Sequence, residues 1–359
     1  MITLKGVKRT LFNLYLQIKR SLSRRLLRLA FVYFEFGLPT FRFVYDSKSV
    51  TDGFGAQFHR ICSIIHVSKM INGKIQRPKI SQVAIHPLDP FQNIYEMELF
   101  LDGANAKLFE SSEFSQDSIS DKRTTLKFVR IKSVNIISLL KLRIKYSFRN
   151  VEVVIVCRDA HSLADSFINS YRTNIYPFFE FLLDCKDYSS QCVVLHIRQG
   201  HGNFAIYPGQ KISRELPIEY FDSIVDSIIR TVDVSDYELI IFTDAPKEDL
   251  AFSPPPQQEY LWRGMPGFDG QNLTHKGRDL EQHFTLKYST EFSKVNLIRD
   301  INPVEMLLIM IGARYLGVSR SSLSFIAGIL NPDGTIFAPP NFWHPSPKVW
   351  RVISNELKT

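Results

Sequence analysis

The sequence predicts an α/β protein built on parallel sheets, and three observations support this. Apolar runs of strand length recur along the chain and end in polar residues. Segments with helical apolar spacing separate these runs, so that strands and helices alternate. The 359 residues are enough for two domains of ordinary size. We therefore expect a basic arm over residues 1–40, then α/β domains over residues 41–187 and 188–359.

Each expected element follows from its local pattern. In the first domain these are a strand (41–45), a glycine-rich junction (51–60), an apolar helix (61–70), a buried strand (151–157) and a helix interrupted near Pro177 (165–184). Residues 80–150 alternate short apolar runs with polar turns. In the second domain they are strands at 192–197, 238–244, 294–298, 316–318 and 336–339, helices at 216–229 and 303–315, and a long loop over 252–279.

The basic arm has the composition of a surface-binding helix. Residues 1–34 contain eight Lys or Arg and no acidic residue, interleaved with Leu, Phe and Tyr. This pattern is typical of a helix lying on an anionic membrane surface. The apolar run 29–38 is too short to span a bilayer and contains Glu35. The alternative is a solvated basic helix packed on the body by its apolar side.

Composition narrows the function classes. The formal net charge of +8 suits an anionic partner. The four cysteines have no CxxC spacing, which favours reduced thiols in the cytoplasm, and no His or Cys pair has ligand spacing, so we expect no metal. Nucleic-acid binding is not favoured, because the densest basic cluster lies in the arm and not on a folded face.

The most informative motif follows the strand at 192–197. His196 and Arg198 stand at its carboxyl end, and Gly200 opens a glycine-rich turn. Open α/β sheets bind ligands at the carboxyl ends of their strands, and glycine lets the backbone approach a phosphate closely. A phosphate-bearing ligand is therefore expected here. The alternatives are a buried core histidine and a structural ion pair of the arginine.

Three segments, in order, resemble one family. The segment from His196 to His201 is similar to the His-Val-Arg-Arg-Gly-Asp motif of α1,2-, α1,6- and protein O-fucosyltransferases. Residues 319–331 resemble the serine-rich segment of the α1,2 enzymes, and residues 52–58 resemble their Gly-Gly-Leu-Gly-Asn-Gln-Leu segment. The resemblance covers residues 52–331. It implies a GT-B fold, with two Rossmann-like domains facing a central cleft, and metal-independent inverting transfer from a GDP-sugar.

The resemblance also implies roles for individual residues. Arg198 would bind the donor diphosphate, and His196 would lie against the base or ribose. The other positions on the donor side are Gly200, Asp244, Glu305, Ser321 and Ser322, and the opposite wall would hold Gly53, Gly55 and Gln57. The serines are equally suited to cap a helix, and the glycines to form a tight turn.

The base that accepts the proton of the acceptor hydroxyl is either His201 or Glu215, and Asp244 is the third candidate. The chain departs from the family at His201, where the motif has an acid, at Met306, beside Glu305, and at residues 325–326, where it has a Trp pair. These departures leave the sugar open. We expect a glycosyltransferase at the cytosolic face of a membrane that moves a sugar, fucose from GDP-fucose as the first choice, onto a cell-surface glycan precursor such as an O-antigen or capsule. The alternatives are a transferase using another nucleotide-sugar and a non-catalytic protein that binds nucleotides or polyanions.

Overall fold

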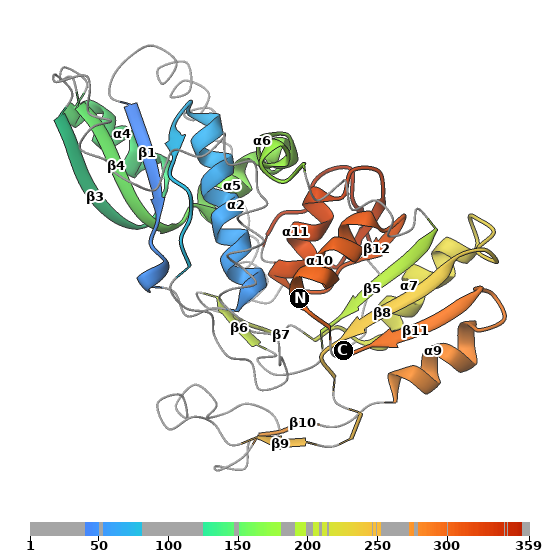
Figure 1. Ribbon diagram of the computed structural model, residues 1–359. Coiled ribbons are helices and arrows are strands. Elements are labelled where there is room, and N and C mark those ends of the chain that lie inside the picture. Colours follow the sequence, from blue (N-terminus) through green and yellow to red (C-terminus); the bar gives the residue numbers. More distant parts are fainter. Residues whose placement is uncertain are drawn as a thin grey trace, which may run out of the picture. The chain divides into compact units, whose positions relative to one another are not determined.

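The chain folds around two parallel sheets with accompanying helices, as the computed structural model in Figure 1 shows. The structure describes residues 40–49, 53–80, 125–146, 151–180, 191–198, 204–207, 210–213, 215–245, 247–248, 250–252, 273–275, 279–299, 301–340, 342 and 344–353. These residues divide into two units: the first takes those within 1–50, 60–79 and 105–177, and the second those within 51–59, 80–104 and 178–359. The predicted domain boundary at 187/188 and residues 1–39 of the basic arm lie outside the described residues.

The sheet of the first unit has the order β2-β1-β4-β3, with parallel neighbours throughout. Its strands are β1 (Thr40–Tyr45), β2 (Lys74–Ile75), β3 (Thr125–Ser133) and β4 (Val151–Asp159). Its helices are η1 (Ser47–Ser49), α2 (Phe54–Met70), α4 (Ile136–Tyr146), α5 (His161–Ala164), η4 (Asp165–Ser170), α6 (Tyr171–Ile175) and η5 (Tyr176–Phe178). The division between the units falls inside α2.

The turn from α2 to β2 shows how local chemistry directs this unit. Asn72 adopts a positive φ of 51°, a conformation that asparagine tolerates just after a helix end. Gly73 follows, and a Cβ there would lie 3.1 Å from the Phe43 ring and 3.2 Å from the Phe41 carbonyl oxygen. The absence of a side chain therefore lets the chain return close against β1, where it forms β2.

The second unit contains a six-stranded sheet of order β11-β8-β5-β12-β13-β14, again with parallel neighbours. The strands are β5 (Cys192–Ile197), β8 (Glu238–Thr243), β11 (Lys294–Ile298), β12 (Tyr315–Gly317), β13 (Thr335–Ala338) and β14 (Arg351–Val352). The helices are α7 (Ile218–Ile229), α9 (Leu280–Tyr288), α10 (Pro303–Gly312) and α11 (Ser322–Leu330). Two antiparallel pairs are added, β6 (Phe204–Tyr207) with β7 (Gln210–Ser213) and β9 (Leu250–Phe252) with β10 (Leu273–His275).

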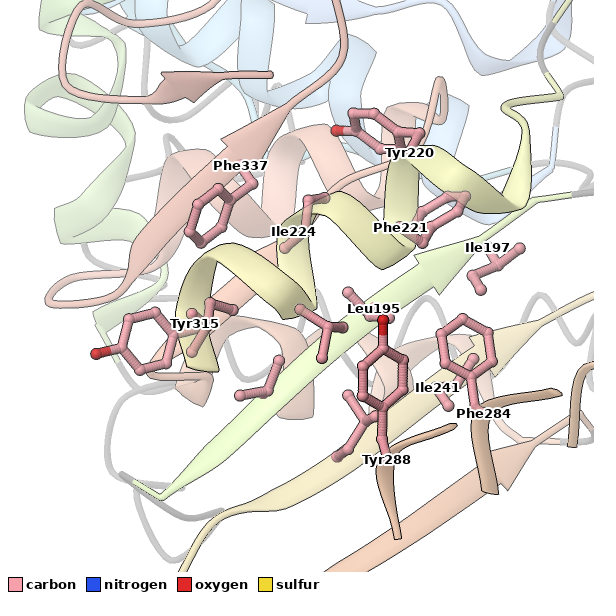
Figure 2. Close-up of a cluster of buried hydrophobic side chains, with 14 of the residues drawn as sticks. Leu195, Ile197, Tyr220, Phe221, Ile224, Ile241, Phe284, Tyr288, Tyr315 and Phe337 are labelled. Atoms are coloured by element: carbon pink, nitrogen blue, oxygen red, sulfur yellow. The ribbon is translucent and has the colours of Figure 1, made fainter. Parts of the chain in front are cut away.

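The core of the second unit lies between the sheet and helices α7 and α9. Leu195 and Ile197 of β5 pack with Phe221 of α7 and Phe284 of α9 in one buried cluster (Figure 2). Gly317 in β12 faces this cluster, since a Cβ there would lie 2.7 Å from Leu195 Cδ2. Alternate residues of β5 thus point into the core, and His196 points to the opposite face of the sheet.

Most of the strongly patterned elements are confirmed, and three expectations are wrong. The helix expected at 61–70 begins at Phe54, so the glycine-rich junction is largely helical. The helix expected at 165–184 is a series of short turns up to Phe178, because Phe167 is non-helical (φ −127°) and Pro177 follows. The pair β3 and α4 lies where only short runs and turns are expected. None of the described helices is long and apolar enough to cross a bilayer.

Candidate functional site

The order of the second sheet defines a point where ligands bind in folds of this kind. From the central strand β5 the chain moves to β8 and β11 on one side, then returns to β12, β13 and β14 on the other. Numbered along the chain, this is the order 3-2-1-4-5-6 of doubly wound sheets, which bind ligands where the direction reverses. The reversal falls between β5 and β12. The residues that follow these two strands therefore form the candidate site.

His196 lies at the end of β5 and is joined to the far side of this reversal. Its Nδ1 lies 3.0 Å from the hydroxyl oxygen of Ser319, which follows β12. The side chain is buried, and this burial lowers the pKa of His196 to about 4, with the nearby Arg198 cation lowering it further and Asp244 raising it. The imidazole is therefore neutral near pH 7, when one ring nitrogen donates a hydrogen bond and the other accepts one.

Ser319 is the residue that sequence reasoning missed. It lies within the serine-rich segment, where the resemblance implies roles for Ser321 and Ser322 alone. It is fully buried, and its hydroxyl oxygen also lies 3.5 Å from that of Ser324. Tyr220 of α7 donates a hydrogen bond to the carbonyl of Val318, at 3.2 Å, and so fixes the same exit from β12. The position of Ser319 in the sequence could have indicated this role, because it is the first residue with a side-chain hydroxyl after the strand.

Arg198 and Asp244 face one another at the ends of the neighbouring strands β5 and β8. Arg198 Nε lies 3.8 Å from Asp244 Oδ2, and each side chain is 24% exposed. Within the described part of the chain, this Nε is buried and has no hydrogen-bond partner. The two charges attract each other without a close hydrogen bond. An anion with better geometry could therefore compete for the guanidinium, whose planar fork matches phosphate oxygens.

The start of α11 lies at the same edge of the sheet. Ser321 is its N-cap, and its hydroxyl oxygen accepts from the Leu323 amide at 3.3 Å, so that the capping alternative is confirmed for this serine. Ser322 is the first helical residue. The amides of a helix's first turn and its positive dipole end favour anions. This end of α11 therefore adds a second source of positive potential at the edge of the sheet where Arg198 follows β5.

The three residues expected on the opposite wall belong to the start of α2. Gly53 precedes the helix, whereas Gly55 and Gln57 are helical, and Gln57 is fully buried. Gly55 is needed for close approach, since a Cβ there would lie 2.6 Å from Cβ of Leu323. Residues 53–59 and 323 belong to the same unit. The alternative that Gly55 forms a tight turn is therefore wrong, because Gly55 is helical and serves helix packing.

The remaining predicted residues are less closely tied to this edge. Glu215 is half-buried, three residues before α7. Glu305 is exposed in the first turn of α10, which Asn302 caps through the Val304 amide at 2.8 Å. Gly200 and His201 lie outside the described residues. Among the residues that the structure describes, no three His, Cys, Asp or Glu side chains gather to hold a metal ion.

The site thus combines an arginine, a neutral histidine held by a serine, and a helix start, all where the strand order reverses. These groups can bind an anion and hydrogen-bond a neighbouring polar group, as a nucleoside diphosphate requires. No protein-family model matches the chain, and no curated protein matches it.

Proposed function

We propose that the chain is an inverting glycosyltransferase of the GT-B type that uses a nucleotide-sugar, with GDP-fucose as the first donor to test. The observation that carries the proposal is the position of Arg198 beside the reversal of strand order, with the start of α11 at the same edge. A diphosphate is the ligand that best matches this combination of a cation and helix amides. The ordered resemblance to fucosyltransferase segments adds the sugar and the reaction.

In this proposal the acceptor hydroxyl attacks the anomeric carbon of the donor sugar. A bond forms from the acceptor oxygen to that carbon as the bond to the diphosphate oxygen breaks, and the nucleoside diphosphate leaves. Arg198 stabilises the charge that develops on the leaving group. The acceptor's proton goes to a base, for which Glu215 and His201 are the candidates. Neutral His196 hydrogen-bonds the ribose or base of the donor.

The proposed acceptor is a glycan precursor at the cytosolic face of a membrane, such as an O-antigen or capsule intermediate. Residues 1–34, with eight cations and no acid, support this placement, because an anionic membrane attracts such a segment. The enzyme would then be peripheral and would meet lipid-linked acceptors at the surface. The acceptor proposal is tested separately from the donor proposal, with purified lipid-linked glycans.

The test of the donor site is nucleotide binding by paired arginine variants. Purified protein is titrated with GDP, UDP, ADP, CMP and dTDP in a thermal-shift assay, alone and as Arg198→Ala or Arg314→Ala. Arg314 immediately precedes β12, at the amino edge of the same sheet, and is exposed. One nucleotide should stabilise the wild type and Arg314→Ala but not Arg198→Ala. Equal stabilisation of all three proteins, or of none, contradicts the proposed site.

A second candidate function is a non-catalytic protein that binds nucleotides or polyanions. It is favoured by His201, which stands where the resembled motif has an acid, and by the sequence pI near 9.2. The two functions differ in turnover. Release of GDP from GDP-fucose, dependent on Arg198, supports the transferase, whereas GDP binding without any donor hydrolysis or transfer supports the binding protein.

A further inference from the structure

We infer that the outward stripe of α4 docks the protein on an anionic membrane surface. This helix follows strand β3 at the edge of the first unit's sheet (Figure 1). Residues 125–146, which form the two elements, contain six Lys or Arg and no Asp or Glu. The inference does not depend on the proposed transferase chemistry or on the basic arm.

The stripe consists of Ile137, Lys141, Ile144 and Lys145. Their spacing of four, three and one places them on one face of a helix. Ile137 is 63% exposed and Ile144 is 67% exposed, and both lysines are exposed. The inward face carries the buried residues Leu139, Arg143 and Tyr146. The helix is therefore held to its unit by one face and presents aliphatic side chains and cations together on the other.

This combination selects the kind of partner. Two β-branched aliphatic side chains left in water gain free energy by entering an apolar phase, and the two lysines favour negative charge at the boundary of that phase. An anionic lipid bilayer offers an apolar phase for the isoleucines and negatively charged headgroups, directly above it, for the lysines. A second copy of the same surface would bring like charges together, and a nucleic acid offers phosphates but little aliphatic surface for the isoleucines.

Strand β3 adds further positive charge, which strengthens the attraction of this unit to an anionic surface. It contributes Lys127, Arg130 and Lys132, and Arg130 is 75% exposed although it lies 3.6 Å from Asp46. Attraction to a charged surface acts over about 10 Å at ordinary salt, so these cations need not touch the lipid. An 11-residue helix is about 16 Å long, which suits a helix lying flat in the headgroup region.

The test places an environment-sensitive fluorophore on the stripe of the full chain. Ile137→Cys is labelled in a Cys185→Ser background, because the other three cysteines are buried. The control is Leu286→Cys on α9, where the leucine is 77% exposed. On vesicles of phosphatidylglycerol and phosphatidylcholine, we expect blue-shifted emission and quenching by a lipid-borne quencher at position 137 only. The local signal separates α4 from the basic arm, which is the same in both proteins.

A charge variant tests the electrostatic half of the inference. Lys141→Glu with Lys145→Glu should weaken the blue shift at position 137, with partitioning weaker by at least roughly 30-fold, since each lost cation costs about fivefold and the anionic surface also repels the two new carboxylates. Lys79→Glu with Lys247→Glu changes the net charge equally at two exposed lysines elsewhere and should have a much smaller effect. The inference is overturned if positions 137 and 286 respond alike, if position 137 stays in water, or if it responds to soluble polyanions and not to vesicles.

Discussion

His196 and Ser319 are joined across the reversal of the second sheet, with 3.0 Å between the imidazole Nδ1 and the hydroxyl oxygen. The two residues are 123 positions apart in the chain. They come together because β5 and β12 are parallel neighbours, with Leu195 opposite Gly317, so that both strands end at the same edge. The bond orients the one buried imidazole that the described candidate site contains.

Removing the serine hydroxyl should weaken nucleotide binding without abolishing it. Ser319→Ala frees the His196 ring to rotate, and the loss of one orienting hydrogen bond costs about 1 kcal/mol, or about fivefold in affinity. Ser68→Ala is the matched control, since Ser68 is also fully buried but its hydroxyl donates to the Ile65 carbonyl within α2. Titration calorimetry with the stabilising nucleotide measures both. An equal loss in the two variants would assign Ser319 to general packing.

Gly55 should be intolerant of any side chain. Gly55→Ala brings a Cβ to 2.6 Å from that of Leu323, between the starts of α2 and α11, which belong to the same unit. Overpacking of this kind costs about 1–3 kcal/mol of unfolding free energy. Gly53→Ala meets nothing within 4 Å and should change stability far less. Urea unfolding of both variants compares them, and similar stabilities would show that the two helix starts separate readily in solution.

The contacts of Asp159 should contribute more to the free energy of unfolding of the first unit than the ion pair of Arg130 with Asp46. One carboxylate oxygen lies 3.1 Å from Arg60 Nη1, and the other accepts from the Ser133 hydroxyl at 2.6 Å, with the side chain only 14% exposed. Asp159→Ala removes both contacts and should cost about 1–3 kcal/mol. Arg130→Ala, which breaks the 3.6 Å pair between the 75% exposed Arg130 and Asp46, should cost less than about 1 kcal/mol. The midpoints of denaturant unfolding of the two variants test this prediction. A larger loss of stability in Arg130→Ala than in Asp159→Ala would contradict it.

The first unit should lose stability on mild acidification through His66. Burial lowers the pKa of His66 to about 3, below the value near 6.5 of an unfolded chain. Between these values the unfolded state binds the proton and the folded state does not, so stability is complete above pH 6.5 and falls by about 1.4 kcal/mol per pH unit as the pH drops toward 3.

His66→Phe isolates this contribution. Phenylalanine keeps a ring against Tyr171, whose centroid lies 4.6 Å from that of His66, but it does not titrate. Unfolding free energies at pH 7 and pH 5 should therefore differ less in the variant than in the wild type. His196, with its pKa also lowered by burial, should keep part of the pH dependence in both proteins. An unchanged dependence in His66→Phe would mean that His66 is protonated in the folded state.

Features that depend on neighbouring residues can be predicted from the sequence of this protein. The apolar run of β5 predicts a buried strand ending at His196 and Arg198, and Pro303 is the predicted first residue of the helix that forms α10. Because the carboxyl ends of parallel strands lie at one edge of a sheet, Arg198 and Asp244 are expected at the same edge. In the structure, Arg198 Nε lies 3.8 Å from Asp244 Oδ2. These inferences hold because strand length, capping and side-chain alternation are local properties.

Which distant residues meet depends on the fold as a whole. The strand order β11-β8-β5-β12-β13-β14 brings Ser319 within hydrogen-bond distance of His196. The start of α2 packs closely against the start of α11, and this packing explains why a glycine is needed at position 55. The exposure of Ile137 and Ile144 likewise depends on what α4 packs against. Register, strand order and burial arise from contacts between segments far apart in the chain, and a local pattern carries no information on which of them will touch.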